Sequence, residues 1–246
     1  MTHSVTAVAI GALIVSGFAQ TARAQPVAAD TNVIAIVLGK RIIASESKQL
    51  SGLIVGPLLE QFARENGIEP TPEELDALVR KTDAISTQQQ ARRKEERDAL
   101  VKELKGSSLS ASEREKKEAR LKKIERVVKY QDDMERQSMV NEEQVRATKR
   151  EAARTVVRTW KINRALYRTY GGRVAFQQAG PEPLGAYRDF LREQERKGRF
   201  RIVDKTLGTS FWGYFTNDSI HTFYSKQEGA KFINTPWWMM DQLPKK

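Results

Sequence analysis

The residues of this chain that could carry out covalent chemistry are few, and they gather around one histidine. His221 lies within three residues of Asp218 and Ser219, which supplies the three residue types of a hydrolytic triad. Triads are built from separate elements of a fold, so closeness in sequence does not by itself indicate one. The neighbouring aromatic residues favour a structural role for His221. A catalytic triad is therefore not favoured. An enzyme of unknown class that uses the C-terminal region is the least favoured of three hypotheses for this chain.

Metal, cofactor and thiol chemistry are not indicated by the sequence. It contains no cysteine, and its adjacent acidic residues, such as Asp132 and Asp133, point about 100° apart on a helix instead of converging on an ion. Gly171-Gly172 lacks the lysine and hydroxyl residue that complete a phosphate-binding loop. We expect no metal, no cofactor, no catalytic residue and no disulfide.

Residues 155–205 are strongly basic, with 12 Lys or Arg residues and 5 acidic ones. Arginine interleaved with aromatic residues is the combination that binds single-stranded nucleic acid. Here the aromatic residues fall at helical or strand spacing, which is typical of a core and disfavours nucleic acid. The region instead predicts a basic face for an anionic envelope polymer or a partner protein, formed by Arg158, Arg164, Arg168 and Arg173.

The N-terminus has the pattern of a secretory signal. An apolar run from Val5 to Ala19 is followed by the small-x-small sequence Ala22-Arg23-Ala24. The run is shorter than the ~20 residues that a membrane-spanning helix needs. We predict cleavage after Ala24, a periplasmic or secreted protein, and no transmembrane segment in the mature chain. An uncleaved N-terminal anchor is the alternative.

The rest of the chain predicts a mainly α protein with a small β component. Residues 25–170 read as a helical module with a long charged arm, and residues 171–246 as a small α+β region that packs on the helices. Helices are expected at 50–66, with a kink or break at Gly56-Pro57, at about 71–105, at 111–170 as one or two helices, and at 184–197. Strands are expected at 33–37, 173–178, 200–203 and 209–215.

The first part of the helical module carries a recognisable series of motifs. The stretch VIAIVLGKRI (33–42) predicts a strand and turn, and LIVGPLLEQFARENGIEPTPEELDALV (53–79) follows it. In the second stretch an apolar helix ends at Gly67-Ile68, and Thr71-Pro72-Glu73-Glu74 then opens the next helix with a capping box. Over about residues 32–80 this series resembles the N-terminal module of SurA-like periplasmic chaperones.

The resemblance implies helices that frame an apolar groove for unfolded segments. Many members also carry a parvulin-type isomerase domain with a pair of active-site histidines, whereas the mature chain has only His221. The resemblance therefore implies a non-catalytic chaperone or assembly factor whose clients are unfolded or outer-membrane proteins. The groove would be lined, unless the rest of the chain covers it, by Leu53, Ile54, Leu58, Leu59 and Phe62.

Two further features of the sequence concern apolar contacts, those of a Trp-Met cluster and those of the long helices. The cluster Trp237, Trp238, Met239 and Met240 is suited to adaptable apolar contacts with a client, although it could instead seal the C-terminal region. The long helices over 106–155 could form a hairpin arm or a coiled-coil homodimer. The spacing of Val156, Trp160 and Tyr167 predicts that this side of the last long helix is buried, with Trp160 and Tyr167 in the core.

Export with cleavage is the prediction that the sequence makes most directly. N-terminal sequencing of the protein from the cell envelope should begin at Gln25. A membrane-bound form that retains Met1 would contradict cleavage and favour the anchor.

Overall fold

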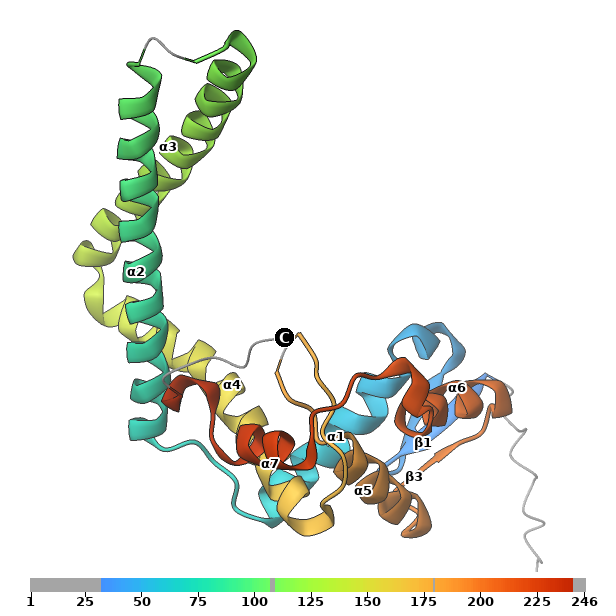
Figure 1. Ribbon diagram of the computed structural model, residues 1–246. Coiled ribbons are helices and arrows are strands. Elements are labelled where there is room, and N and C mark those ends of the chain that lie inside the picture. Colours follow the sequence, from blue (N-terminus) through green and yellow to red (C-terminus); the bar gives the residue numbers. More distant parts are fainter. Residues whose placement is uncertain (1–31, 107–108, 179, 241–246) are drawn as a thin grey trace, which may run out of the picture. The chain divides into compact units, whose positions relative to one another are not determined.

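The computed structural model describes residues 32–106, 109–178 and 180–240 (Figure 1). Over these residues the chain forms seven α-helices, three short 3-10 helices and one three-stranded sheet. This confirms the mainly α class with a small β component. The predicted signal sequence and its cleavage site lie outside the described residues.

The sheet joins the beginning of the described chain to its C-terminal third. Its order is β2-β1-β3, with β1 (Val33–Val37) antiparallel both to β2 (Lys40–Ile43) and to β3 (Phe200–Ile202). Leu38 and Gly39 form the turn with φ angles of 48° and 80°, which glycine adopts freely. A 3-10 helix, η1 (Ala44–Gln49), then leads into the first α-helix. The predicted strands at 33–37 and 200–203 are confirmed.

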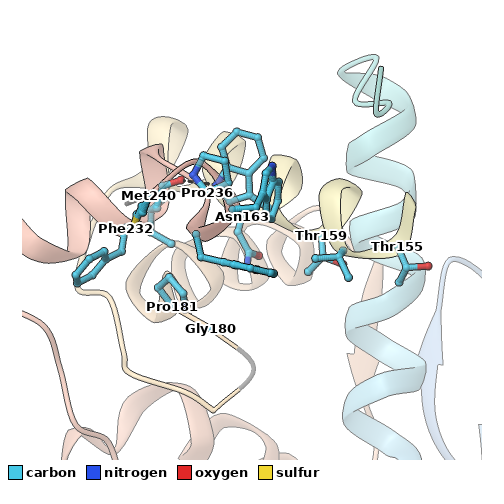
Figure 2. Close-up of a pocket in the computed structure, with 13 residues that line it drawn as sticks. Thr155, Thr159, Asn163, Gly180, Pro181, Phe232, Pro236 and Met240 are labelled. Atoms are coloured by element: carbon cyan, nitrogen blue, oxygen red, sulfur yellow. Dashed lines mark hydrogen bonds between the residues drawn. The ribbon is translucent and has the colours of Figure 1, made fainter. Parts of the chain in front are cut away.

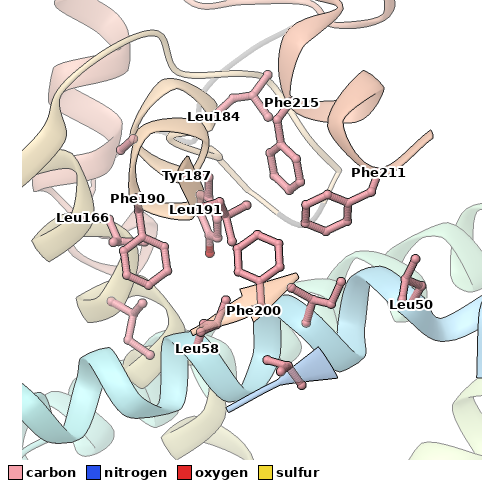
Figure 3. Close-up of a cluster of buried hydrophobic side chains, with 14 of the residues drawn as sticks. Leu50, Leu58, Leu166, Leu184, Tyr187, Phe190, Leu191, Phe200, Phe211 and Phe215 are labelled. Carbon is pink, nitrogen blue, oxygen red and sulfur yellow. The ribbon is translucent and has the colours of Figure 1, made fainter. Parts of the chain in front are cut away.

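Helix α1 (Leu50–Glu65) supplies one wall of the main core. It runs through Pro57 without interruption, so the alternative of two abutting helices is wrong. Figure 3 shows its buried face against rings from α5 (Leu184–Arg196), β3 and α6 (Lys205–Thr216). Residues on both sides of position 170 therefore share one core, whose larger members are Leu50, Ile54, Leu58, Leu166, Tyr187, Phe190, Leu191, Phe200, Phe211 and Phe215.

The apolar stripe of α1 is a closed core and not an open groove. Ile54 and Leu58 are 0% and 1% exposed. Leu53, Leu59 and Phe62 are partly buried and pack against the same cluster. The Phe62 ring meets Phe190 edge to face, with ring centroids 5.4 Å apart. The rest of the chain thus covers Ile54 and Leu58, which cannot line a client groove, and Leu53, Leu59 and Phe62 pack against the same core.

Helices α2 (Pro72–Leu104) and α3 (Ala111–Val140) lie side by side and antiparallel (Figure 1). Each begins with a capping box: the Thr71 hydroxyl accepts from the Glu74 amide, and the Ser110 hydroxyl accepts from the Glu113 amide. Ion pairs cross between the helices, including both guanidinium contacts of Arg120 with Glu96 at 2.7 and 3.0 Å. Within one chain, the long helices therefore form a hairpin.

Helix α4 (Glu142–Tyr170) follows α3 after Asn141, whose non-helical backbone separates the two helices. The buried α4 residues are Ala153, Val157, Ile162 and Leu166. Val156 is 43% exposed, and Trp160 and Tyr167 are only partly buried. The prediction that α4 buries the side with Val156, Trp160 and Tyr167 was wrong. Helix α4 packs between two clusters, so its buried residues lie on two sides of the helix instead of along one stripe.

The C-terminal region contains more helix than expected. The predicted strand at 209–215 lies inside α6, where the Asp204 carboxylate caps the helix by accepting from the Leu207 amide at 2.9 Å. The predicted strand at 173–178 is reduced to isolated bridges from Ala175 to Glu182 and Phe223. The remaining elements are the 3-10 helix η2 (Asp218–Ile220), helix α7 (Lys226–Asn234) and the 3-10 helix η3 (Trp237–Met239).

A contact between two glycines fixes the start of α5 against the turn after α4. A Cβ atom on Gly172 would lie 2.8 Å from the Cα atom of Gly185, and Gly172 also has a φ of 91°. Both facts require glycine at 172. Among the described residues, no helix combines the length and the apolar composition needed to cross a membrane.

The closed core makes a stability prediction with a matched control. Ile54→Ala should lower the free energy of unfolding by about 2–5 kcal/mol, because a fully buried side chain leaves a cavity. Ile220→Ala removes the same atoms from a side chain that is 59% exposed and should change it by less than about 0.5 kcal/mol. Urea unfolding measures both; equal effects would contradict the closed core.

Candidate functional site

A second buried cluster holds the C-terminal segment across two helices. Trp238 is 6% exposed and packs with Leu75 and Leu78 of α2 and with Ala153 and Val157 of α4. The Lys81 ammonium group of α2 donates to the carbonyl of Met240 at 3.1 Å. Residues 236–240 are therefore anchored on α2 and α4 by apolar burial at one end and a hydrogen bond at the other.

Trp160 links this cluster to α7. Its ring meets Trp238 edge to face, with centroids 5.6 Å apart, and its indole Nε1–H donates to the carbonyl of Ile233 at 3.0 Å. The Arg164 guanidinium lies 5.2 Å from the centroid of the Trp160 ring. Burial, together with the like charge of Arg168, lowers the pKa of Arg164 from its ordinary value. Trp160 thus holds α7 at a fixed distance from α4.

Between these elements lies an apolar pocket of about 230 Å³ (Figure 2). In the figure, Thr155, Thr159 and Asn163 follow one another along α4, while Phe232, Pro236 and Met240 come from the opposite side. Most of its surface is apolar, so it resembles a site for side chains and not for an ion. Its lining residues are Thr155, Val156, Thr159, Trp160, Asn163, Gly180, Pro181, Phe232, Ile233, Pro236, Trp237, Trp238 and Met240.

Asn163, which lines the pocket, is held in place by a hydrogen bond. The Asn163 side-chain oxygen accepts a hydrogen bond of 2.7 Å from the Tyr187 hydroxyl. Burial raises the pKa of Tyr187, so this hydroxyl stays protonated and remains a donor. Within the described part of the chain, the Asn163 Nδ2 group has no hydrogen-bond partner. It is therefore a donor available to a ligand, next to the exposed hydroxyl-bearing residues Thr155 and Thr159.

The structure separates the four residues of the Trp-Met cluster. Trp237 is partly buried and lines the pocket, and Met240 lines it with 8% exposure. Trp238 is chiefly a structural anchor, and Met239 is 65% exposed outside the pocket. Sequence reasoning missed Asn163, Pro181 and Phe232, because no sequence signal places these distant segments against one another.

Half of the predicted basic face is engaged within the chain. Arg158 forms ion pairs with Glu60 and Glu69, and its hydrogen bond to Glu60 is the main cause that raises the pKa of Arg158. Arg173 pairs with Asp218 at 2.5 Å and also stacks on the Phe223 ring.

The other two basic residues lie on the second half of α4. Arg164 stacks on Trp160, and its Nε atom is buried without a hydrogen-bond partner among the described residues. Arg168 is exposed. The basic face predicted from four arginines is thus reduced to two of them, Arg164 and Arg168, which lie one helical turn apart.

His221 does not form a triad. Its Nε2 atom lies 2.7 Å from the carbonyl oxygen of Tyr214. The Ser219 hydroxyl donates to the Asn217 side chain at 2.7 Å, and Asp218 pairs with Arg173. The three residues are thus engaged with other partners. Across the described residues, no group of three His, Cys, Asp or Glu side chains lies close enough to hold a metal ion.

Comparisons of the chain with protein-family models, with curated proteins and with solved structures returned no match.

The free energy of unfolding can distinguish Trp238, which anchors the C-terminal segment, from Trp237, which lines the pocket. Trp238→Ala should lower the free energy of unfolding by about 3–5 kcal/mol, since truncating a buried tryptophan leaves a large cavity. Met239→Ala, two-thirds exposed, should stay within about 0.5 kcal/mol of the parent. Trp237→Ala should fall between them. Chemical denaturation followed by circular dichroism checks the order, and a Trp238→Ala variant as stable as the parent would contradict it.

Proposed function

We propose that this chain is an exported, non-catalytic chaperone or assembly factor that binds an extended segment of another polypeptide. The binding site is the pocket between α4, α7 and residues 236–240. The observation that carries the proposal is an apolar pocket with aromatic and proline walls, lined also by the Asn163 amide donor, which has no partner among the described residues.

The chemistry of the pocket matches an extended peptide. Aromatic and proline residues such as Trp237, Pro181 and Pro236 form the type of surface against which extended, proline-rich or apolar segments dock. The apolar walls would remove side chains from water at about 25 cal/mol per Å². The Asn163 Nδ2 group can donate to a peptide carbonyl, which an unfolded segment exposes along its whole length.

The size of the pocket favours part of a large partner over a whole small molecule. At about 230 Å³ it is smaller than the ~300–1,000 Å³ of usual small-molecule sites. A few side chains of a polypeptide can fill it while the rest of the segment continues over α4. Unfolded or outer-membrane proteins, the clients that the SurA-like resemblance implies, are extended chains of this kind.

The SurA-like resemblance of residues 32–80 supports the chaperone assignment and is itself part of the proposal. The client site proposed here is not the one that the resemblance implied, since the stripe at 53–62 is closed. Export through the N-terminal signal is likewise proposed. The competing function is binding of an anionic polymer through the basic face, and the ion pairs of Arg158 and Arg173 count against it.

The test fills the pocket without disturbing the core. Thr159→Phe places a ring in the pocket from an exposed position on α4, and Thr148→Phe makes the same change elsewhere on that helix. We expect the parent and Thr148→Phe to slow the aggregation of an unfolded outer-membrane protein. Thr159→Phe should lose most of this activity while its circular dichroism and unfolding midpoint stay unchanged.

The dependence of binding on salt concentration distinguishes the proposed apolar pocket from the competing basic face. Apolar binding should change little between 50 and 200 mM salt, whereas binding through several phosphate contacts should weaken by about 10³-fold or more. Arg168→Glu, at an exposed position of the predicted basic face, should leave the client activity intact. A steep salt dependence, or loss of activity only in this variant, would contradict the pocket as the site. Equal activity of the two Thr→Phe variants would contradict it as well.

A further inference from the structure

Helix α3 carries a second apolar line that the hairpin does not cover. Val127, Tyr130 and Met134 are spaced by three and four residues, which places them on one line along the helix. They are 42%, 65% and 49% exposed. The buried residues Ile124 and Val128, 5% and 6% exposed, lie on a different face of the helix. We call Val127, Tyr130 and Met134 the α3 line.

Tyr130 and Met134 of the α3 line are exposed, and they border a shallow groove instead of packing into a core. Tyr130 and Met134 belong to neither of the two buried clusters. Both line a shallow groove whose other walls are mostly polar residues of α2 and α4, including Gln90 and Gln144. Exposing three large apolar side chains in a row to water is energetically unfavourable, and a second surface that covers them would remove this cost.

The charges of α3 indicate which surface does so. Residues 111–130 carry eight Lys or Arg and four Glu residues, whereas residues 131–140 carry three acidic residues and one Arg. The sign therefore changes at the α3 line itself. An antiparallel copy of the same helix would place the basic part of each opposite the acidic part of the other, with the α3 lines in register.

We propose that two copies of this chain pair through α3, antiparallel and related by a two-fold axis near Tyr130. In that register Val127 of one copy faces Met134 of the other, and the two Tyr130 rings meet at the axis. Arg126 and Asp133 lie on the same flank of the α3 line, so each faces its opposite in the second copy. A closed pairing of this kind uses one surface twice and stops at two chains.

The pairing requires little rearrangement of the monomer. Asp133 pairs with Arg136 of its own helix, and both side chains are about half exposed or more. Exposed ion pairs contribute little, so Asp133 can exchange one partner for another at small cost. A parallel arrangement would align like charges along both helices and is disfavoured. The proposal does not depend on the chaperone function, because it uses a different helix face.

The first experiment measures the mass of the full chain by sedimentation equilibrium or light scattering at up to ~100 µM. We expect a dimer. Tyr130→Glu with Met134→Glu should give a monomer, whereas Val140→Glu, at a position that is 80% exposed and off the line, should not. A parent chain that is monomeric, or a dimer that survives the double variant, would overturn the proposal.

Charge reversal tests the register. Arg126→Glu and Asp133→Arg should each raise the dissociation constant of the dimer about 5- to 10-fold, since two exposed ion pairs change per dimer. The double variant restores opposite charges and should bring the constant back near that of the parent. Arg126 is exposed and Asp133 partly exposed, so circular dichroism should stay unchanged. A double variant no tighter than the singles would overturn this pairing.

Cross-linking tests the direction, because the chain has no cysteine of its own. In the antiparallel register, Val127→Cys with Met134→Cys should form a disulfide-linked dimer on mild oxidation. Each single variant should not, since its two sulfur atoms are separated by about seven residues, or ~10 Å along the helix. A dimer in which the single variants cross-link efficiently would be parallel, and the proposal would be wrong.

Discussion

The burial of helix α4 on two sides is the constraint on which the rest of the structure depends. Its second half places Leu166 in the main core with α1 and α5, and its first half places Val157 against α2 and Trp238. Both side chains are fully buried, so α4 cannot rotate to improve one contact without losing the other. It therefore sets the position of the α2–α3 hairpin relative to the sheet and of the C-terminal segment relative to both.

The candidate site is a consequence of this double burial. Thr155, Thr159 and Asn163 of the same helix line the pocket, and α7 lies beside them through the Trp160 hydrogen bond to Ile233. The pocket is thus formed by elements already held in place for structural reasons. Little ordering would accompany the binding of a ligand, and a preformed site of this type loses less affinity to entropy.

Local signals predicted the elements well, and non-local contacts are where prediction failed. The capping boxes at Thr71 and Ser110 were readable because they act within one helical turn. The region 209–215 was misassigned because its aromatic residues also suit a strand, whereas a cap at Asp204 and the burial of Phe211 and Phe215 make it a helix. The buried side of α4 was misjudged because one stripe was assumed where two partners compete.

The sequence by itself determined the class of the fold, the positions of most helices and the lack of cysteine. These follow from composition, periodicity and capping, which are properties of short windows. Only the tertiary structure decided that the stripe at 53–62 packs into a core. It also decided that Trp238 is an anchor, whereas Trp237 and Asn163 line a pocket. Such facts depend on which surfaces meet across 70 residues or more, and the energy of that choice comes from packing, which local pattern does not encode.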